Sequence, residues 1–387
     1  MKYTLFTAIS VFLFFSCSDE REVISELSYE FVLDDSVKLN IGLEPQFVSK
    51  KAEANVFLAY TRINSTFQIF NQSGKLLHSF NRIGEDAESY NKNVYGAGIR
   101  DGKLYIQDIS KVHAYDLGGN HLWSQNYNNR IPNTVGGNIR GEFQMLNDSI
   151  WVNPLIFSGV VSFSKQKLAI LDTLNTVELF QLGGKANRSS VKVDEFSFEE
   201  ESMYLGNLIY PNFLPVIEAT KNGLWVAYPY ELVLHFYEYE QGVRHHKAYN
   251  IQLDRFKDPK GAEESELIDP MNKISPRLIG LNSQILKLYA MEADKLFILY
   301  KTGIPNKRRF EESLVPFYDE SKFFGAIFQD GKIVSSAIEI PRGGFQYKNE
   351  DRYVYLGDDK WMFLQENMTE KDYYTGYIYR LKPVNPL

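Results

Sequence analysis

The chain is poor in cysteine, in net basic charge and in long apolar runs. Its 387 residues include one cysteine, Cys17, so disulfide bonds and thiol chemistry are excluded from the folded body. Asp and Glu (49) outnumber Lys and Arg (42), and a net charge of −7 provides no basic field to hold nucleic acid. After residue 16, no stretch approaches the roughly 18 consecutive apolar residues of a membrane-spanning helix. Stability must therefore come from packing, and a chain of this size can bury about 75% of its unfolded surface.

The single cysteine follows a segment with the features of an export signal. The chain starts with a short basic stretch at residues 1–3, continues with an apolar stretch at residues 5–15, and becomes polar and mostly acidic after Cys17. The apolar stretch is too short to span a membrane. We therefore predict a lipoprotein signal peptide at 1–16, lipidation of Cys17, and an acidic tether at 17–27. Ordinary secretion with an incidental cysteine is the alternative.

The residues Leu13-Phe14-Phe15-Ser16 resemble the lipobox of bacterial lipoproteins, with Phe15 where Ala or Ser is usual. Such relaxed lipoboxes resemble those of Bacteroidota. The acidic residues Asp19, Glu20 and Glu22 are similar to the signal that sends such lipoproteins to the cell surface. The resemblance implies a diacylglycerol on the sulfur and an amide-linked chain, and stable anchoring requires more than one acyl chain. We expect lipid anchoring in the outer membrane, at the cell surface rather than on the periplasmic face.

Strand-forming residues dominate the rest of the chain, which has 27 Phe, 25 Tyr and 4 Trp. Six segments share one form, a polar turn followed by a short, nearly all-apolar strand, and three of the four tryptophans fall in them. Apolar runs without alternation are typical of strands buried on both faces. These core segments are Val56–Leu58, Leu104–Ile106, Ile150–Val152, Leu224–Val226, Leu296–Ile298 and Trp361–Phe363.

A hairpin follows most of these cores. Its turn contains glycine, which supplies the positive φ of tight hairpins, and lies at Gln72–Gly74, Asp116–Asn120, Gln241–Gly242 and Asp330–Gly331. The third hairpin is weaker, with Leu168–Leu171 followed by Val177–Phe180. Irregular intervals of about 45 to 75 residues with a constant strand pattern indicate a β-propeller with loop insertions. We count six blades, and a seventh could lie around Phe196 to Ile209.

The two ends of the chain complement each other. The last core is followed by one more strand, Tyr377–Leu381, so the last blade lacks an outer strand. Two strands, Tyr29–Leu33 and Val37–Ile41, precede the first core without a blade of their own. We therefore predict that N-terminal strands complete the last blade and close a single all-β propeller domain over residues 28–387.

Three segments of the first two repeats carry a resemblance to a known family: Arg82–Tyr90, Gly102–Asp108 and Lys111–Asn120. They resemble the NHL-like repeats of uncharacterised six-bladed propeller lipoproteins of Bacteroidota, and the match is clear over residues 55–125. The chain departs from that pattern at Glu85–Ser89, where a turn with Gly and Pro is usual. The resemblance implies a fold and a location, and it brings no catalytic residues.

Few residues suggest chemistry. His235, His245 and His246 lie on one predicted hairpin with Glu238 and Glu240, so a metal site of two histidines and one carboxylate is conceivable. Adjacent residues of a strand point to opposite faces, however, so His245 and His246 cannot easily serve one ion. The runs Glu199–Glu201, Glu263–Glu266 and Glu311–Glu312 are typical of solvated loops rather than of glycosidase carboxyl pairs. Calcium-loop, phosphate-loop and Gly-x-Ser-x-Gly motifs are missing from the sequence. We predict no catalytic, cofactor-binding or metal residues.

Binding surfaces are the remaining candidates. Tyrosines such as Tyr228, Tyr230, Tyr373, Tyr374 and Tyr377 could stack on sugars, although most should pack between blades. Three long insertions, Ala186–Met203, Lys257–Pro276 and Gly303–Lys322, could frame one face of the propeller. The last contains a local basic patch, and we take Lys307, Arg308 and Arg309 as a candidate interaction loop; a variable loop is the alternative.

The sequence therefore favours a non-catalytic cell-envelope lipoprotein. Its membrane contact is the N-terminal lipid, its propeller face binds a protein partner or an extracellular ligand such as a glycan, and it has no cofactor and no nucleic-acid partner. A polysaccharide-acting enzyme, either a lyase or a glycoside hydrolase, is the alternative. A sensory or assembly role with an obligate partner is a third hypothesis, which a broad apolar patch would favour, whereas a deep axial pocket would favour ligand binding.

Overall fold

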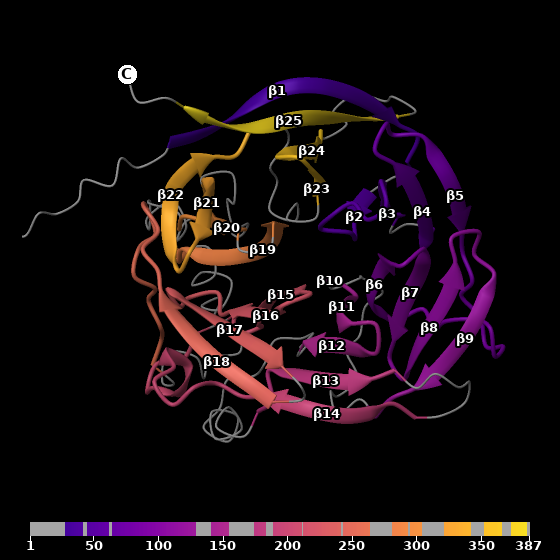
Figure 1. Cartoon of the computed structure of the whole chain (residues 1–387), viewed down its shortest axis with the longest axis horizontal. Coiled ribbons are helices and arrows are strands. Elements are labelled where there is room, and N and C mark those ends of the chain that lie inside the picture. Colours follow the sequence, from indigo (N-terminus) through magenta and orange to yellow (C-terminus); the bar gives the residue numbers. More distant parts are fainter. Residues whose placement is uncertain are drawn as a thin grey trace, which may run out of the picture.

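Six β-sheets surround a central axis in the computed structural model (Figure 1). The structure describes residues 28–41, 45–61, 64–128, 141–154, 174–182, 189–210, 212–240, 243–263, 281–292, 295–303, 321–341, 352–365 and 373–384. Each sheet has four antiparallel strands, and the second sheet has a fifth strand that pairs in parallel at its inner edge. The chain is thus a six-bladed β-propeller, which confirms the predicted fold.

The first three blades follow chain order from the axis outward. The first contains β2 (Pro45–Phe47), β3 (Val56–Thr61), β4 (Thr66–Asn71) and β5 (Leu76–Phe80). The second contains β6 (Val94–Arg100), β7 (Lys103–Asp108), β8 (Lys111–Asp116) and β9 (His121–Asn126), with β10 (Gly141–Glu142) inside β6. The third contains β11 (Gln144–Asn147), β12 (Ile150–Pro154), β13 (Val177–Gln181) and β14 (Val191–Phe196).

The fourth and fifth blades repeat this order, and the sixth departs from it. The fourth contains β15 (Val216–Thr220), β16 (Gly223–Ala227), β17 (Val233–Glu240) and β18 (Val243–Asn250). The fifth contains β19 (Gln284–Glu292), β20 (Lys295–Lys301), β21 (Phe323–Gln329) and β22 (Lys332–Glu339). The sixth contains β23 (Tyr353–Gly357), β24 (Lys360–Leu364), β25 (Tyr374–Val384) and β1 (Ser28–Leu39). A short 3-10 helix, η1 (Met203–Leu205), precedes the fourth blade.

The six apolar core segments predicted from the sequence lie in the second strand of each blade, counted from the axis: β3, β7, β12, β16, β20 and β24. Every residue of β3 and β16 is buried, because each blade packs against a neighbour on both faces. The buried side chains form six clusters, one between each pair of neighbouring blades. Trp151, Trp225 and Trp361 each belong to one of these clusters, where a buried aromatic side chain contributes roughly 1.5–3 kcal/mol.

The ring is closed by the N-terminal strand, as predicted. In Figure 1 the indigo β1 and the yellow β25 lie side by side, and their pairing runs from Ser28 opposite Val384 to Leu39 opposite Tyr374. One long strand with an irregularity after Leu33 replaces the two short strands expected from the sequence. Gly74, in the turn between β4 and β5, has a φ of +79° and lies against β1, so it combines hairpin geometry with close packing.

Two details of the third and fourth blades differ from expectation. The predicted insertion Ala186–Met203 contains the outer strand β14, so it is in part a blade strand rather than a loop. Val177–Phe180 belongs to the third strand of its blade, and Leu168–Leu171 lies outside the described residues. The described residues between Phe196 and Ile209 contain η1 and no further sheet, so they do not form a seventh blade.

In the part of the chain that the structure describes, no helix is long and apolar enough to cross a membrane.

Candidate functional site

Side chains join the inner edges of three neighbouring blades at the axis. Gln144 on β11 accepts a hydrogen bond from the Ala219 N–H at 2.6 Å and donates one to the Ile217 carbonyl at 3.3 Å, both on β15. Glu218, also on β15, accepts a hydrogen bond from the Ala290 N–H on β19 at 3.0 Å. Inner strands expose backbone groups that a sheet partner would otherwise pair. The two side chains supply that pairing.

Lys50, which follows β2, extends into the same place. Its Nζ donates to Glu218 Oε2 at 2.7 Å and to the carbonyl oxygens of Ile217 at 2.6 Å and Leu288 at 3.4 Å. The side chains of Lys50 and Glu218 are only 11% and 8% exposed. A buried ammonium group is tolerated here because each of its three protons has an acceptor.

Glu142 completes this axial cluster of Lys50, Glu142, Gln144 and Glu218. It is half-buried on β10, and its Oε1 accepts a hydrogen bond from the Lys50 N–H at 3.2 Å. Burial raises the pKa of Glu142 to about 8, and the charge of Glu218 adds to the effect, while Lys50 and Lys287 oppose it. The shift favours the protonated form of Glu142, in which the carboxyl can donate a hydrogen bond as well as accept one.

Two clefts lie along the axis, and both contact the axial cluster. The larger has a volume of about 460 Å³ and includes the last residues of β6 and β15; the smaller, of about 250 Å³, includes the first residues of β15 and β19. Two pairings between inner segments are parallel, that of Lys51 with Tyr355 and that of β10 with β6. The inner strands of neighbouring blades thus run in the same direction along the axis, so their first residues lie on one face of the propeller and their last residues on the other. The clefts therefore open toward opposite faces of the propeller, and Glu142 and Gln144 line both.

Charged side chains of both signs line the larger cleft. Besides Glu142 they include Lys51, Glu53, Arg100, Lys221 and Glu292. Burial raises the pKa of Glu53, although a hydrogen bond from the Asp101 N–H at 2.7 Å opposes that rise. A concave site with convergent polar groups is suited to a small polar molecule.

Exposed apolar side chains do not gather on one face. Among the described residues, the large ones on strands lie on four different outer strands: Leu33 on β1, Leu77 on β5, Leu122 on β9, and Val191 and Val193 on β14. They are distributed around the rim of the propeller, where scattered exposed apolar residues are normal. The described surface thus lacks the broad apolar patch expected of an obligate assembly partner.

The two most specific sequence predictions lie outside the described residues. These are the lipidation site Cys17 and the basic residues Lys307, Arg308 and Arg309. The described residue just before the basic loop, Gly303, lies against the Leu281 carbonyl, close to the start of β19.

The structure separates the three clustered histidines in the expected way. His245 lies opposite Glu238 in the β17–β18 ladder, and the neighbouring His246 lies opposite Tyr237. His235 and His246 come together, with His235 Nδ1 at 3.1 Å from His246 Nε2. His245 is exposed and takes no part in this contact.

A second polar chain was not anticipated from the sequence. On the second blade, Asp108 Oδ2 lies 3.0 Å from His113 Nε2, and His113 Nδ1 lies 2.8 Å from Ser124 Oγ. The order of groups matches a Ser-His-Asp relay. However, His113 is fully buried, and Asp108 also accepts hydrogen bonds from three backbone N–H groups. We interpret this chain as structural.

The remaining candidates are mostly part of the core. Tyr228 and Tyr230 are 1% and 2% exposed, so they pack between blades and cannot stack on a sugar, whereas Tyr373, Tyr374 and Tyr377 are half-buried. Glu200 and Glu201 are exposed, as expected of a solvated run. The axial residues had one recognisable signal, which is a lone Glu218 in an otherwise apolar strand directly before a core strand.

Comparisons with known proteins indicate the fold and nothing finer. A scan against family models and a search of curated proteins found no match. Among solved structures, a candidate exported protein of Bacteroides fragilis aligns with 92% of this chain and 96% of its own, at 11% identity and a TM-score of 0.50. A luciferin-regenerating enzyme (91% and 96%, 9% identity, TM-score 0.45) and virginiamycin B lyase of Staphylococcus aureus (92% and 100%, 10% identity, TM-score 0.41) are also similar.

Proposed function

We propose that the protein is a non-catalytic cell-envelope lipoprotein whose propeller binds a small polar extracellular ligand in the larger axial cleft. The observation that carries this proposal is the axial cluster, of which Glu142, Gln144 and Glu218 line the cleft. The ion pair between Glu218 and the buried Lys50 holds this lining in place. A lining held by satisfied hydrogen bonds is rigid, and rigid concave sites bind small ligands well. The mixed charges of the lining favour a glycan fragment or a short peptide over an apolar molecule.

The envelope location rests on the N-terminus. An apolar stretch at residues 5–15 followed by Cys17 supports lipidation, and the acidic residues after it support display at the cell surface. The resemblance to NHL-like propeller lipoproteins of Bacteroidota is consistent with both. Lys307, Arg308 and Arg309 are proposed, from their charge alone, as a contact for a protein partner.

Binding can be tested with defined probes. We would measure the melting temperature of the purified protein with xylo-, manno- and cello-oligosaccharides and with tri- and tetrapeptides, and then measure affinities by calorimetry. A probe that binds in this cleft should raise the melting temperature. Glu142→Gln and Arg100→Ala should weaken binding of that probe, whereas Glu30→Gln, on the exposed edge of β1, should leave binding unchanged. A second experiment cross-links the protein on intact cells. If no probe binds to the purified protein but a partner protein is cross-linked to it on cells, the ligand is that partner and the cleft proposal is wrong.

One observation favours an enzyme as the second candidate. Glu142 and Glu218 line the same cleft, and burial raises the pKa of Glu142; two carboxyl groups in different environments are typical of glycoside hydrolysis. Glu142 would then be the acid. Oligosaccharides incubated with the protein should be shortened by the wild type and left intact by Glu142→Gln. If both proteins leave every probe intact but bind it, the cleft is a binding site.

A further inference from the structure

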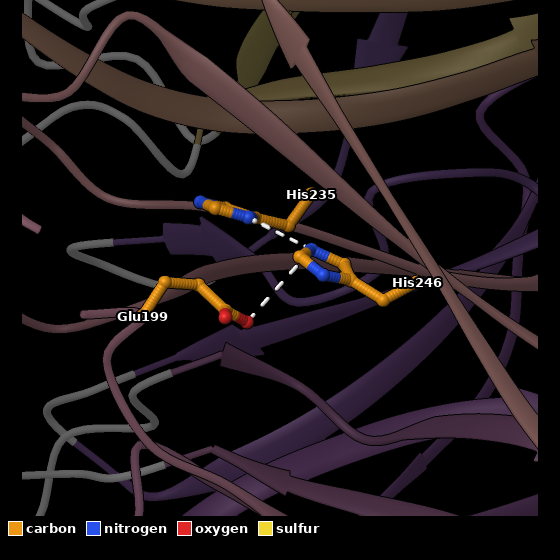
Figure 2. A group of neighbouring side chains, drawn as sticks. All are labelled: Glu199, His235 and His246. Carbon is orange, nitrogen blue, oxygen red and sulfur yellow. Dashed lines mark hydrogen bonds and ion pairs between the residues drawn. The ribbon is translucent and has the colours of Figure 1, made fainter. Parts of the chain in front are cut away.

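Three potential metal ligands from two different blades converge near the rim (Figure 2). Glu199 lies in the segment after β14 of the third blade, His235 on β17 and His246 on β18 of the fourth. Figure 2 shows the two imidazole rings facing each other, with the Glu199 carboxylate directed at His246. His235 Nδ1 lies 3.1 Å from His246 Nε2, which lies 3.8 Å from Glu199 Oε1.

The strand ladder accounts for the meeting of the two histidines. His246 pairs directly with Tyr237, and His235 lies two residues from Tyr237 on the same face of β17. The His246 and Tyr237 rings stack with centroids 4.7 Å apart, which fixes the orientation of the imidazole. His245 points to the other face of the sheet, so the pair involves only one of the two adjacent histidines.

Glu199 is held in place by the same tyrosine. The Tyr237 hydroxyl donates to Glu199 Oε1 at 2.9 Å, so the carboxylate is oriented by a neighbour that is not itself a ligand. Hydrogen bonds of this kind orient the ligands of metal sites. Arg244 does not compete for the carboxylate, because it pairs with Asp194 at 3.3 Å and lies over the Phe196 ring.

We propose that Glu199, His235 and His246 bind one divalent transition-metal ion, with Zn²⁺ as the preferred ion. Zn²⁺ binds His nitrogen and carboxylate oxygen at about 2.0–2.2 Å, so ligand atoms at the corners of a tetrahedron lie about 3.3 Å apart. The His235–His246 and His246–Glu199 separations, 3.1 and 3.8 Å, lie on either side of that value, and all three ligand atoms lie within 4.8 Å of one another. Binding of an ion would draw the partly exposed side chains of His246 and Glu199 inward.

The exposure of the three side chains specifies the kind of site. His235 is buried, while the side chains of His246 and Glu199 are 31% and 40% exposed. Two histidines and one carboxylate leave a fourth position on the exposed side, where water or an external ligand can bind. An ion here would also join the segment after the third blade to the hairpin of the fourth. The sequence pointed to the histidines of this hairpin but offered Glu238 and Glu240 as the carboxylates, because Glu199 lies far along the chain from the hairpin.

Calorimetry on the full-length protein tests the proposal. The protein is purified without a polyhistidine tag, stripped with chelator and titrated with Zn²⁺, and with Mg²⁺ as a control for non-specific binding. We expect one Zn²⁺ per chain and no binding of Mg²⁺. His246→Ala and Glu199→Gln should weaken Zn²⁺ binding at least about tenfold, because even ligand-orienting neighbours contribute that much. His245→Ala, on the opposite face of β18, is the matched control and should leave the affinity unchanged.

Two further measurements separate an ion site from a simple hydrogen bond between the rings. Co²⁺ bound by this donor set gives visible absorption bands that His246→Ala abolishes, and Tyr237→Phe should weaken Zn²⁺ binding about tenfold without loss of the fold. Melting curves of the metal-free variants verify folding. The proposal is overturned if the wild type binds no stoichiometric Zn²⁺, or if His246→Ala and Glu199→Gln bind it as well as His245→Ala does.

Discussion

Lys50 Nζ lies 2.7 Å from Glu218 Oε2, although 168 residues separate the two in the sequence. The pair links the segment after the first blade's inner strand to the inner strand of the fourth blade. Because Glu218 also accepts from the Ala290 N–H of the fifth blade, three blades are connected at one buried point. We therefore regard the axis as a structural element of the propeller and not as an open channel.

Removal of Lys50 should be costly. Lys50→Met leaves Glu218 buried without its counter-ion, and breaking a buried pair in this way costs about 3–5 kcal/mol. Urea denaturation would show this as a lower midpoint at an unchanged slope. The double variant Lys50→Met with Glu218→Gln should recover part of the loss, since no uncompensated charge remains. Equal stability of the single variant and the wild type would contradict a buried ion pair.

The raised pKa of Glu142 predicts a dependence of stability on pH. In the unfolded chain this carboxyl loses its proton near its usual pKa of 4.5, whereas in the fold it holds the proton to about pH 8. The folded state thus binds more protons between these values, and its stability falls as pH rises through that window. Glu142→Gln, which mimics the protonated acid, should remove that part of the pH dependence. Melting temperatures from pH 5 to pH 9 would reveal it as a smaller decline in the variant.

Asp108 should be important for stability and not for catalysis. Burial acts to raise its pKa, but the hydrogen bonds from His113 and from backbone N–H groups outweigh burial and hold the pKa below its usual value. Asp108→Ala removes the acceptor of several buried donors, at a cost of about 2–4 kcal/mol. Ser124→Ala should cost about 1 kcal/mol. If Ser124 were a nucleophile, a fluorophosphonate probe would label it, and we expect no labelling.

The closing strand offers a test with an internal control. Phe31 on β1 contacts the rings of Phe297, Trp361 and Phe363, with centroids 5.3 to 6.2 Å apart. Phe31→Ala should cost about 2–3 kcal/mol, less than the 3–5 kcal/mol typical of a fully buried Phe. Leu33→Ala changes a side chain on the same strand that is 55% exposed, and it should cost less than about 0.5 kcal/mol. Similar losses for both variants would argue against closure by packing of β1.

The proposed anchor depends on one atom. Cys17→Ser removes the sulfur that carries the diacylglycerol, so the protein should move from the membrane fraction to the soluble fraction. Growth with an alkynyl fatty acid should label the wild type and not the variant. Protease added to intact cells should degrade the wild type if it is displayed at the surface. Membrane association that survives Cys17→Ser would favour another mode of attachment.

The repeated part of the fold was predictable from the sequence because each blade buries its second strand on both faces. Local apolar runs therefore mark β3, β7, β12, β16, β20 and β24 directly. The direction in which a side chain packs was not predictable. Trp151 and Trp225 are both central in their core segments, yet Trp151 packs toward the second blade and Trp225 toward the fifth. A shift of one residue in strand pairing moves a side chain from one face of the sheet to the other. The pairing of β11 with β12 contains such an irregularity after Met145.

The candidate site was less predictable because it is built from distant residues. Lys50, Glu142 and Glu218 each look like an isolated charge in the sequence, and only the closed ring brings them to one point. In the sequence, Glu199 looks like one member of the exposed acidic run Glu199–Glu201. In the structure, it is the member of that run that lies beside His246. Spacing along the chain cannot reveal such pairs when different blades supply the partners.

The pairing of β1 with β25 determines when the protein can become complete during its synthesis. β1 (Ser28–Leu39) leaves the ribosome long before its sheet partner β25 (Tyr374–Val384). Until then the sixth blade has no outer strand, and the apolar face of Phe31 has no neighbour. Such long-range pairing is slow and exposes the chain to aggregation. The ring therefore cannot close before the last residues of β25 are available.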